Sequence, residues 1–224
     1  MSLEKEMVLK AYGAKVVRAP ANVESSDPRH YINVAKRIAK KTGAYFPNQY
    51  YNHANILAHY QTTGPEIWRD TNGKLTHFIA PIGTGGTMSG TAKYLKEQNP
   101  KIVTIGVDPE GSLLHHYFYK TKGRAHPYKV EGPGEDFMPG AMDFSVVDEV
   151  ITVGDKDSFV TARNLVKKEG IFAGGSSGLA VFAALQISKT LSKDNIVVVI
   201  LPDSGRSYVS KFYNDEWMKK EGFL

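Results

Sequence analysis

The sequence predicts an α/β fold in which helices cover both faces of a mostly parallel, doubly wound sheet. Three observations favour this class. From residue 77 onward, apolar runs that end in polar loops alternate with segments of helical periodicity. The run at 196–201 is almost entirely β-branched, which is typical of a strand covered on both faces. Three polar loops stand where ligands collect in such sheets, namely Gly83–Thr87, Gly174–Gly178 and Pro202–Ser204.

The composition is that of an ordinary globular protein. Of the 224 residues, 42% are hydrophobic and 23% charged, enough to bury a sizeable core. The net charge of +5 comes from scattered lysines and arginines, without the basic and aromatic interleaving of a nucleic-acid groove. Cysteine is absent, which excludes disulfides and cysteine-ligated metals. Residues 1–10 are too charged for a signal peptide and no long apolar span occurs, so we expect a cytoplasmic protein that binds neither nucleic acid nor membrane.

The first part of the sequence is interpreted as two helices and two short strands, followed by a third helical pattern at 56–60. Ser2 is a good cap for a first helix, and a strand is expected at 14–19. A second helix is expected from Asp27 to Gly43, because proline directly after Asp27 favours a helix start and glycine a helix end. A short strand is expected at 44–46.

This order lacks a first strand from which a crossover could begin. We therefore expect residues 1–61 to be the remnant of a small αβ domain and residues 62–224 to form a large domain, with 62–73 as the link between them. The stretch 49–55 is rich in amides and aromatics, which suits contact with a polar ligand. Helix capping explains Asn55 equally well.

The segment from His77 to Gly90 is the centre of the predicted fold. An apolar run ends in Gly83-Thr84-Gly85-Gly86-Thr87, here called the glycine loop, and a helical pattern then runs to Asn99. A helix that begins in such a loop presents free N–H groups and the positive end of its dipole. Three glycines allow close approach of an anion and two threonines add hydroxyl donors. The loop therefore predicts a phosphate site.

The residues alone leave alternatives for this loop. A P-loop needs a Gly-Lys-Ser/Thr ending, and no lysine occurs before Lys93. The dinucleotide pattern needs glycine at position 88, which is Met88. Asp108 nevertheless ends the next apolar run, near the distance expected of a ribose-binding acid, so a nucleotide site stays open. A tight turn without any ligand is the third interpretation.

Downstream, the alternation of strand and helix pauses. Residues 111–146 contain several glycines and prolines and are expected to form a long irregular loop or lid. A helix is expected from Asp157 to Gly170, and the loop that begins at Gly174 opens another. The strand at 196–201 follows. His115 and its neighbour His116 lack the spacing of a metal-ligand pair, so no metal is expected.

Five motifs in one order carry a resemblance to a known family. They are Ile82-Gly-Thr-Gly-Gly-Thr87, Gly106-Val-Asp-Pro-Glu-Gly-Ser112, Val130-Glu-Gly-Pro-Gly-Glu-Asp-Phe-Met-Pro139, Ala173-Gly-Gly-Ser-Ser-Gly178 and Leu201-Pro-Asp-Ser-Gly-Arg-Ser-Tyr208. In these motifs the sequence resembles the cystathionine β-synthases and the O-acetylserine sulfhydrylases (cysteine synthases). Both are fold-type-II, tryptophan synthase β-like enzymes that use pyridoxal 5′-phosphate. The resemblance covers the whole chain, which looks like the C-terminal two-thirds of a catalytic core.

The resemblance implies roles for several residues. It assigns the cofactor phosphate to the glycine loop, that is to Gly83, Thr84, Gly85, Gly86 and Thr87, and places Ser176 against the pyridine nitrogen. A neutral hydroxyl makes the ring a weaker electron sink than a carboxylate would, which favours loss of a β-substituent. Gln49 is assigned to the substrate carboxylate, and Gly132 and Gly134 to the active-site lid.

The sequence departs from the family pattern in two ways. Pro133 replaces an aliphatic residue and Glu135 stands where animal enzymes carry tyrosine, which leaves homocysteine and sulfide open as second substrates. The family's cofactor-binding lysine and its Ser-Gly-Asn-Thr loop have no match, so no catalytic residue is assigned. We expect this polypeptide to be inactive alone, with phosphate or sulfate able to occupy the cofactor's phosphate site and a separately encoded N-terminal piece as one partner.

The implied reaction is a β-replacement on serine or an activated serine, by a lyase or transferase of transsulfuration and cysteine biosynthesis. Its substrates would be small amino acids and a thiol or sulfide: homocysteine for a cystathionine β-synthase, sulfide for a cysteine synthase. Family members are homodimers, so a homodimer is expected. A non-catalytic nucleotide- or anion-binding Rossmann-like module is the alternative from a different class.

Overall fold

The computed structural model describes residues 1–20 and 23–224. These residues form a parallel sheet of four strands in the order β3-β2-β1-β4. The strands are β1 (His77–Pro81), β2 (Val103–Pro109), β3 (Glu149–Val153) and β4 (Val197–Val199). In register, Ile79 of β1 lies beside Ile105 of β2 and Val199 of β4. The predicted α/β fold with a parallel, doubly wound sheet is confirmed.

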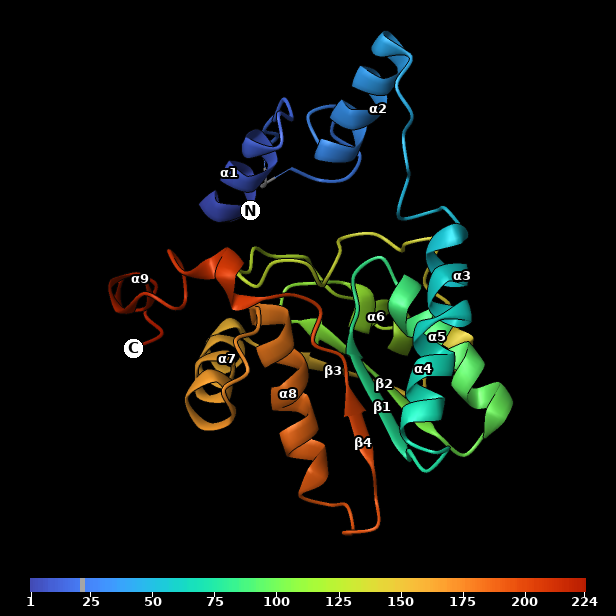
Figure 1. Ribbon diagram of the computed structural model, residues 1–224. Coiled ribbons are helices and arrows are strands. Elements are labelled where there is room, and N and C mark those ends of the chain that lie inside the picture. The colour runs from blue at the N-terminus through green and yellow to red at the C-terminus, as the bar shows by residue number, and fades with distance from the viewer. Residues whose placement is uncertain (21–22) are drawn as a thin grey trace.

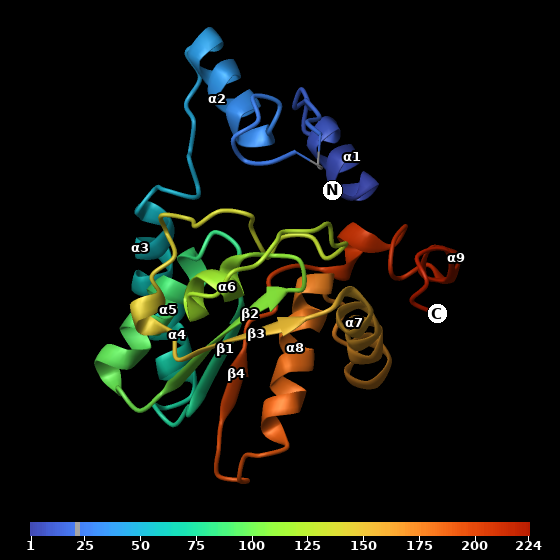
Figure 2. The ribbon, with the colours of Figure 1, turned by 180° about the vertical axis from the view of Figure 1, so that it is seen from behind.

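Helices cover both faces of the sheet because successive side chains of each strand point to opposite sides. Phe78 and Ala80 of β1 pack on one face and Ile79 on the other, and all three are fully buried. One face carries α5 (Gly86–Gln98), α3 (Ala54–Gln61), α4 (Thr63–Asp70) and α6 (Leu114–Tyr119). The other carries α7 (Asp155–Glu169) and α8 (Gly175–Ser188) (Figure 2).

The C-terminal segment closes the α7 side of the core. It contains the 3-10 helix η2 (Gly205–Tyr208) and α9 (Asp215–Lys220). The rings of Phe159 and Phe212 stack with centroids 4.8 Å apart. An ion pair between Arg163 and Asp215 fixes α9 to α7. Aromatic contacts of this kind account for much of the burial in the second half of the chain.

Two further helices lie above the carboxyl ends of the strands, α1 (Leu3–Ala11) and α2 (Tyr31–Thr42) (Figure 1). Ser2 caps α1 as predicted, by accepting a hydrogen bond from the Lys5 N–H. Glu4 of α1 accepts hydrogen bonds from the backbone N–H and the hydroxyl of Ser210, at 2.7 and 2.9 Å. These bonds attach the first helix to the C-terminal segment.

The two strands expected in this first part are wrong. Residues 14–19 and 44–46 form no strand, since no other strand of the described chain lies beside them to complete a ladder. The second helix begins at Tyr31 rather than at Asp27, because the Asp27 carboxylate folds back onto the Arg29 N–H at 2.7 Å and forms a turn. Gly43 ends that helix in the left-handed conformation, as predicted.

Four other expectations need correction. Residues 62–73 hold the helix α4 rather than a plain link, and the region 111–146 includes α6 and the 3-10 helix η1 (Phe144–Val146). The helix expected from Asp157 begins two residues earlier. The short β4 spans Val197–Val199 rather than 196–201 and is half-buried at the sheet edge, although its side chains pack alternately against the core on both faces, as expected. The strand β3 was not anticipated.

The division of the chain at residue 61 remains a prediction. Within the described residues, no helix is both long and apolar enough to cross a bilayer.

Candidate functional site

The glycine loop joins β1 to α5 at the carboxyl edge of the sheet. Gly85 caps α5 in the left-handed region with φ 89°, a conformation that favours glycine. A Cβ at Gly85 would lie 2.5 Å from the Met142 Cα, and one at Gly86 would collide with the Asn55 amide. The loop glycines are thus required by close packing against the protein itself, before any ligand is considered.

The loop presents unused hydrogen-bond donors. In the described chain, the backbone N–H groups of Gly83, Thr84, Gly85 and Thr87 make no hydrogen bond. The Gly86 N–H has only a long contact of 3.4 Å to the Thr84 hydroxyl. Four free donors at the positive end of a helix form a site suited to an anion.

Two side chains of α3 hold the threonines of the loop. The Asn55 amide donates to the Thr84 hydroxyl at 3.0 Å and to the Gln49 carbonyl at 2.9 Å. His59 Nε2 lies 3.0 Å from the Thr87 hydroxyl. From the sequence, Asn55 was expected only as a ligand contact or a helix cap, and no role was predicted for His59. The spacing of four residues, which puts both on one helix face, was the available signal.

The expected lid lies directly against the glycine loop. This lid segment, Val130–Pro139, is anchored where the Gly134 N–H donates to the Ile82 carbonyl at 2.7 Å. A Cβ at Gly83 would lie 2.7 Å from the Gly132 carbonyl oxygen. Both Gly132 and Gly134 have positive φ, at 107° and 84°. The structure therefore brings the lid glycines beside the predicted phosphate site, with Gln49 joined to it through Asn55.

A half-buried carboxyl follows the lid glycines. The Tyr50 hydroxyl donates to Glu135 Oε1 at 2.6 Å, and Tyr31 of α2 contacts the Tyr50 hydroxyl. Burial raises the pKa of Glu135 to about 7, with further upward contributions from Asp136 and Asp108, against the lowering effect of the Tyr50 hydrogen bond. From the sequence, Tyr50 was placed in a stretch suited to contact with a polar ligand. It instead links the stretch that contains Gln49 to the lid segment.

A second titrating carboxyl lies nearby, at the end of β2. Burial raises the pKa of Asp108 to about 6, although Ser112 and the His115 N–H lower it by hydrogen bonding. The Asp108 carboxylate thus caps the start of α6. The sequence had left this carboxylate open as a ribose contact. This internal role removes the main support for a dinucleotide site.

The second glycine-rich loop lies where α8 begins. The Gly174 N–H donates to the Asp203 carbonyl at 2.9 Å, and Ala173 pairs with Ser204 in an isolated bridge. Two of the three polar loops expected at this edge are therefore in direct contact. Ser176 is 4% exposed, and the Ser177 hydroxyl and Asp203 Oδ1 are buried without a partner in the described chain. Among the residues that the structure describes, no hydrogen bond joins Ser176 to the glycine loop.

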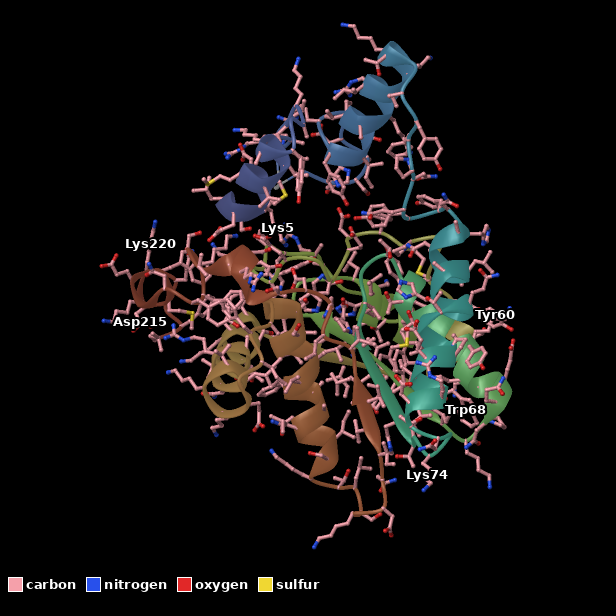
Figure 3. All side chains as sticks on the ribbon, in the orientation of Figure 1. Lys5, Tyr60, Trp68, Lys74, Asp215 and Lys220 are labelled. Carbon is pink, nitrogen blue, oxygen red and sulfur yellow. The ribbon has the colours of Figure 1, made fainter. Side chains whose placement is uncertain are left out.

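A group of charges connects α1 to this edge. Lys5 lies on α1 near the C-terminal segment (Figure 3). Its Nζ is 2.6 Å from the Tyr208 hydroxyl, 3.3 Å from Glu131 and 3.6 Å from Asp203. Glu131 also pairs with Lys211 at 2.5 Å. Glu131 directly precedes Gly132, so the group ties α1 to the base of the lid segment. The described residues include no cluster of three or more histidine or acidic side chains able to hold a metal ion.

Comparison with known proteins identifies the family. A family model described as pyridoxal-phosphate dependent enzyme matches residues 1–203. The chain belongs to this family of pyridoxal-phosphate enzymes. Its relatives include cystathionine β-synthases from Oryctolagus cuniculus, 44% identical over 225 residues, and Saccharomyces cerevisiae, 45% identical over 229. The alignments cover 100% and 98% of this chain but 41% and 45% of those proteins. The chain thus spans less than half the length of the relatives it matches.

The residues present fit pyridoxal phosphate, the cofactor of these enzymes. The glycine loop would hold the phosphate with its four free N–H groups and the hydroxyls of Thr84 and Thr87. The buried hydroxyl of Ser176 would serve as a neutral partner for the ring. When bound, the cofactor supplies an electron sink for bonds to the substrate's α- and β-carbons.

Proposed function

We propose that the chain forms the phosphate-binding and lid portion of a pyridoxal-phosphate enzyme that catalyses β-replacement on serine or an activated serine, in the manner of a cystathionine β-synthase. The observation that carries this proposal is the set of free N–H groups in the glycine loop beside the lid glycines. The name shared by the relatives supports the reaction class, with homocysteine as the acceptor.

Each part of the site has a task in this proposal. The glycine loop holds the cofactor's phosphate, and Ser176 faces its ring nitrogen without adding negative charge. Gln49 orients the substrate carboxylate from an exposed position beside Asn55. Gly132 and Gly134 close over the site and exclude water, because their positive φ values allow the backbone to turn tightly against Ile82 and Gly83.

We assign no cofactor-binding lysine within these 224 residues. Lys5 is near the Asp203 segment, but its amine is already in contact with Tyr208, Glu131 and Asp203. An amine held as an ion-paired cation is not a nucleophile. The polypeptide alone therefore holds pyridoxal phosphate through its phosphate, and forms neither cystathionine nor cysteine. The complete enzyme is proposed to be a cytoplasmic homodimer.

The experiment is a thermal-shift titration with pyridoxal phosphate, inorganic phosphate and NAD in parallel, followed by a visible spectrum and a turnover assay. Pyridoxal phosphate and phosphate should raise the melting temperature, while the absorbance of lysine-bound cofactor and product formation should both be absent. Stabilisation by NAD alone would instead support the nucleotide-binding module. A borohydride-trapped adduct on one lysine of this chain, together with turnover, would show that the catalytic amine had been overlooked.

Sulfide stays open as the second acceptor, because the lid segment departs from the form that the animal enzymes carry. Pro133 and Glu135 make the lid segment differ from the animal pattern, and Glu135 lies against Tyr50 rather than in open solvent. This chain would be combined with an N-terminal piece that carries the cofactor-binding lysine. Comparing homocysteine with sulfide as acceptors in that enzyme decides between a cystathionine β-synthase and a cysteine synthase.

A further inference from the structure

His59 lies behind the glycine loop and contacts one of its hydroxyls. Its Nε2 is 3.0 Å from Thr87 Oγ1, and its Nδ1 is 3.0 Å from Thr63 Oγ1 at the start of α4. The imidazole is thus placed between two hydroxyls, one of which belongs to the proposed anion site. Burial lowers the pKa of His59, so the ring is neutral above the ordinary histidine range and carries one N–H.

A neutral imidazole in this position has two arrangements with opposite effects on Thr87. If the proton is on Nδ1, the ring donates to Thr63 and Nε2 accepts the Thr87 proton, so Thr87 presents only lone pairs to an anion. If the proton is on Nε2, the ring donates to Thr87 Oγ1 and Thr63 donates to Nδ1. The Thr87 hydroxyl proton is then free to point toward the anion.

The packing of α3 against α5 keeps His59 and Thr87 together. Gly90 follows Thr87 by three residues, and a Cβ there would collide with the Ile56 carbonyl and lie 2.9 Å from the His59 Cβ. Likewise, a Cβ at Gly64 would lie 2.7 Å from the Tyr94 Cβ, which presses the start of α4 onto α5. Because the backbones are this close, the side chains of Thr63, His59 and Thr87 cannot move apart. What can still change is which nitrogen of the His59 ring carries the proton.

We propose that His59 is a positioning residue that makes Thr87 a hydrogen-bond donor to the bound phosphate, and that the anion selects the Nε2–H tautomer. This inference rests on the proposed function, because it takes the glycine loop as the phosphate site. The chain of donors runs from Thr63 through His59 and Thr87 to the anion, and each member donates once. An anion and the opposite tautomer exclude one another, since the hydroxyl lone pairs would face negative charge.

The test measures affinity for inorganic phosphate and the state of the ring in the full chain. His59→Gln keeps an N–H that can reach Thr87, whereas His59→Leu removes every hydrogen bond. The glutamine variant should bind phosphate within about threefold of the parent, and the leucine variant roughly tenfold more weakly, as expected for loss of a hydrogen bond to a charged group. In a Thr87→Val background, His59→Leu should add less than about twofold, because the effect passes through that hydroxyl.

Long-range nitrogen NMR of histidine-labelled protein at about pH 8, above the usual histidine pKa, reads the tautomer directly. With phosphate bound, the His59 signals, assigned through His59→Gln, should show the proton on Nε2. Two results would overturn the inference while leaving the phosphate site intact. One is a ring with the proton on Nδ1. The other is a loss of phosphate affinity on His59→Leu that is as large in the Thr87→Val background as in the parent. Failure of the folded parent chain to bind phosphate or pyridoxal phosphate would overturn the proposed function, and the inference with it.

Discussion

At the scale of single residues, the glycines of the glycine loop are required by packing, whereas its threonine hydroxyls are available to a ligand. Gly85 and Gly86 have no room for a side chain because Met142 and Asn55 fill the space. Substituting Gly85 would strain a left-handed backbone and displace Met142, so it tests folding rather than anion binding. The hydroxyls of Thr84 and Thr87 can be removed without changing side-chain shape, and they are the sharper probes.

Thr84→Val should weaken binding of inorganic phosphate and leave the fold intact. The change removes one hydroxyl donor and one acceptor for Asn55, whose amide keeps its bond to the Gln49 carbonyl. We expect a loss of about 1–2 kcal/mol in binding free energy, measured by calorimetry. Thr190→Val, at an exposed helix end far along the chain, is the control and should bind phosphate like the parent. Equal affinity of the Thr84 variant and the parent would remove that hydroxyl from the site.

Glu135→Gln should change how stability depends on pH. The folded-state pKa is raised from 4.5 to about 7, so between those values the folded protein binds more protons than the unfolded chain. Stability from this group is complete below pH 4.5, falls as pH rises to about 7, and is constant above. The variant should therefore gain stability relative to the parent at pH 8, by at most about 3 kcal/mol, but not at acid pH.

Chemical denaturation at several pH values measures this difference. Asp108 titrates in the same range in both proteins, since its pKa is raised to about 6, so it largely cancels in the comparison. A parent-to-variant difference that does not vary with pH would contradict a half-buried, proton-binding Glu135.

At the scale of elements, the α1 helix depends on a charged contact with the base of the lid segment. Lys5→Met keeps the aliphatic stem but removes the ion pairs of Lys5 with Glu131 and Asp203. Glu131 then keeps only Lys211 and the N-terminal amine as partners. We expect a loss of roughly 1 kcal/mol, because these groups are only partly buried, and faster hydrogen exchange in α1. The control is Lys10→Met, which removes an exposed amine from Glu6 but leaves that carboxylate paired with Arg18, and it should have little effect.

If both lysine variants accelerated exchange equally, the contact between α1 and the lid segment would not be what stabilises the helix.

Elements with a strong local signal were predictable, and those that depend on neighbours were not. The glycine loop could be placed from sequence because a strand, a turn and a helix start all coincide there. The strand expected at 14–19 had the right residue types, but a strand needs a partner, which sequence alone does not supply. α4 was missed because Gly64 and Pro65 favour a turn, yet packing against Tyr94 holds that turn as a helix start.

The site residues likewise divide into those with a local sequence signal and those that depend on tertiary contacts. The residues carried over from the family motifs lie at one edge of the sheet, since parallel strands bring their following loops together. The residues that hold these side chains in place lie outside the family motifs and could not be predicted from them. Asn55, His59 and Tyr50 act through tertiary contacts with Thr84, Thr87 and Glu135, and such pairs depend on how α3 crosses α5.

At the scale of the whole molecule, apolar side chains in the first part of the chain, on α1 and α2 and in the segments that follow them, are uncovered. Val17 and Ile38 are 54% and 41% exposed, Val16 and Phe46 are half-buried, and Met7 and Val8 of α1 lie in solvent. Patches of this kind favour self-association. We expect a dimer or larger species at micromolar concentration by light scattering, weakened by Val8→Lys. A monomer over that range would contradict this expectation.

The most direct test of the account is an amide NMR titration of the chain with inorganic phosphate and then with pyridoxal phosphate. We expect the N–H signals of Gly83, Thr84, Gly85 and Thr87 to shift together and saturably, and the two ligands to compete for the loop. NAD should leave these signals unchanged. Shifts confined to other parts of the chain, or no saturable shift with either ligand, would contradict the assignment of the glycine loop as the phosphate site.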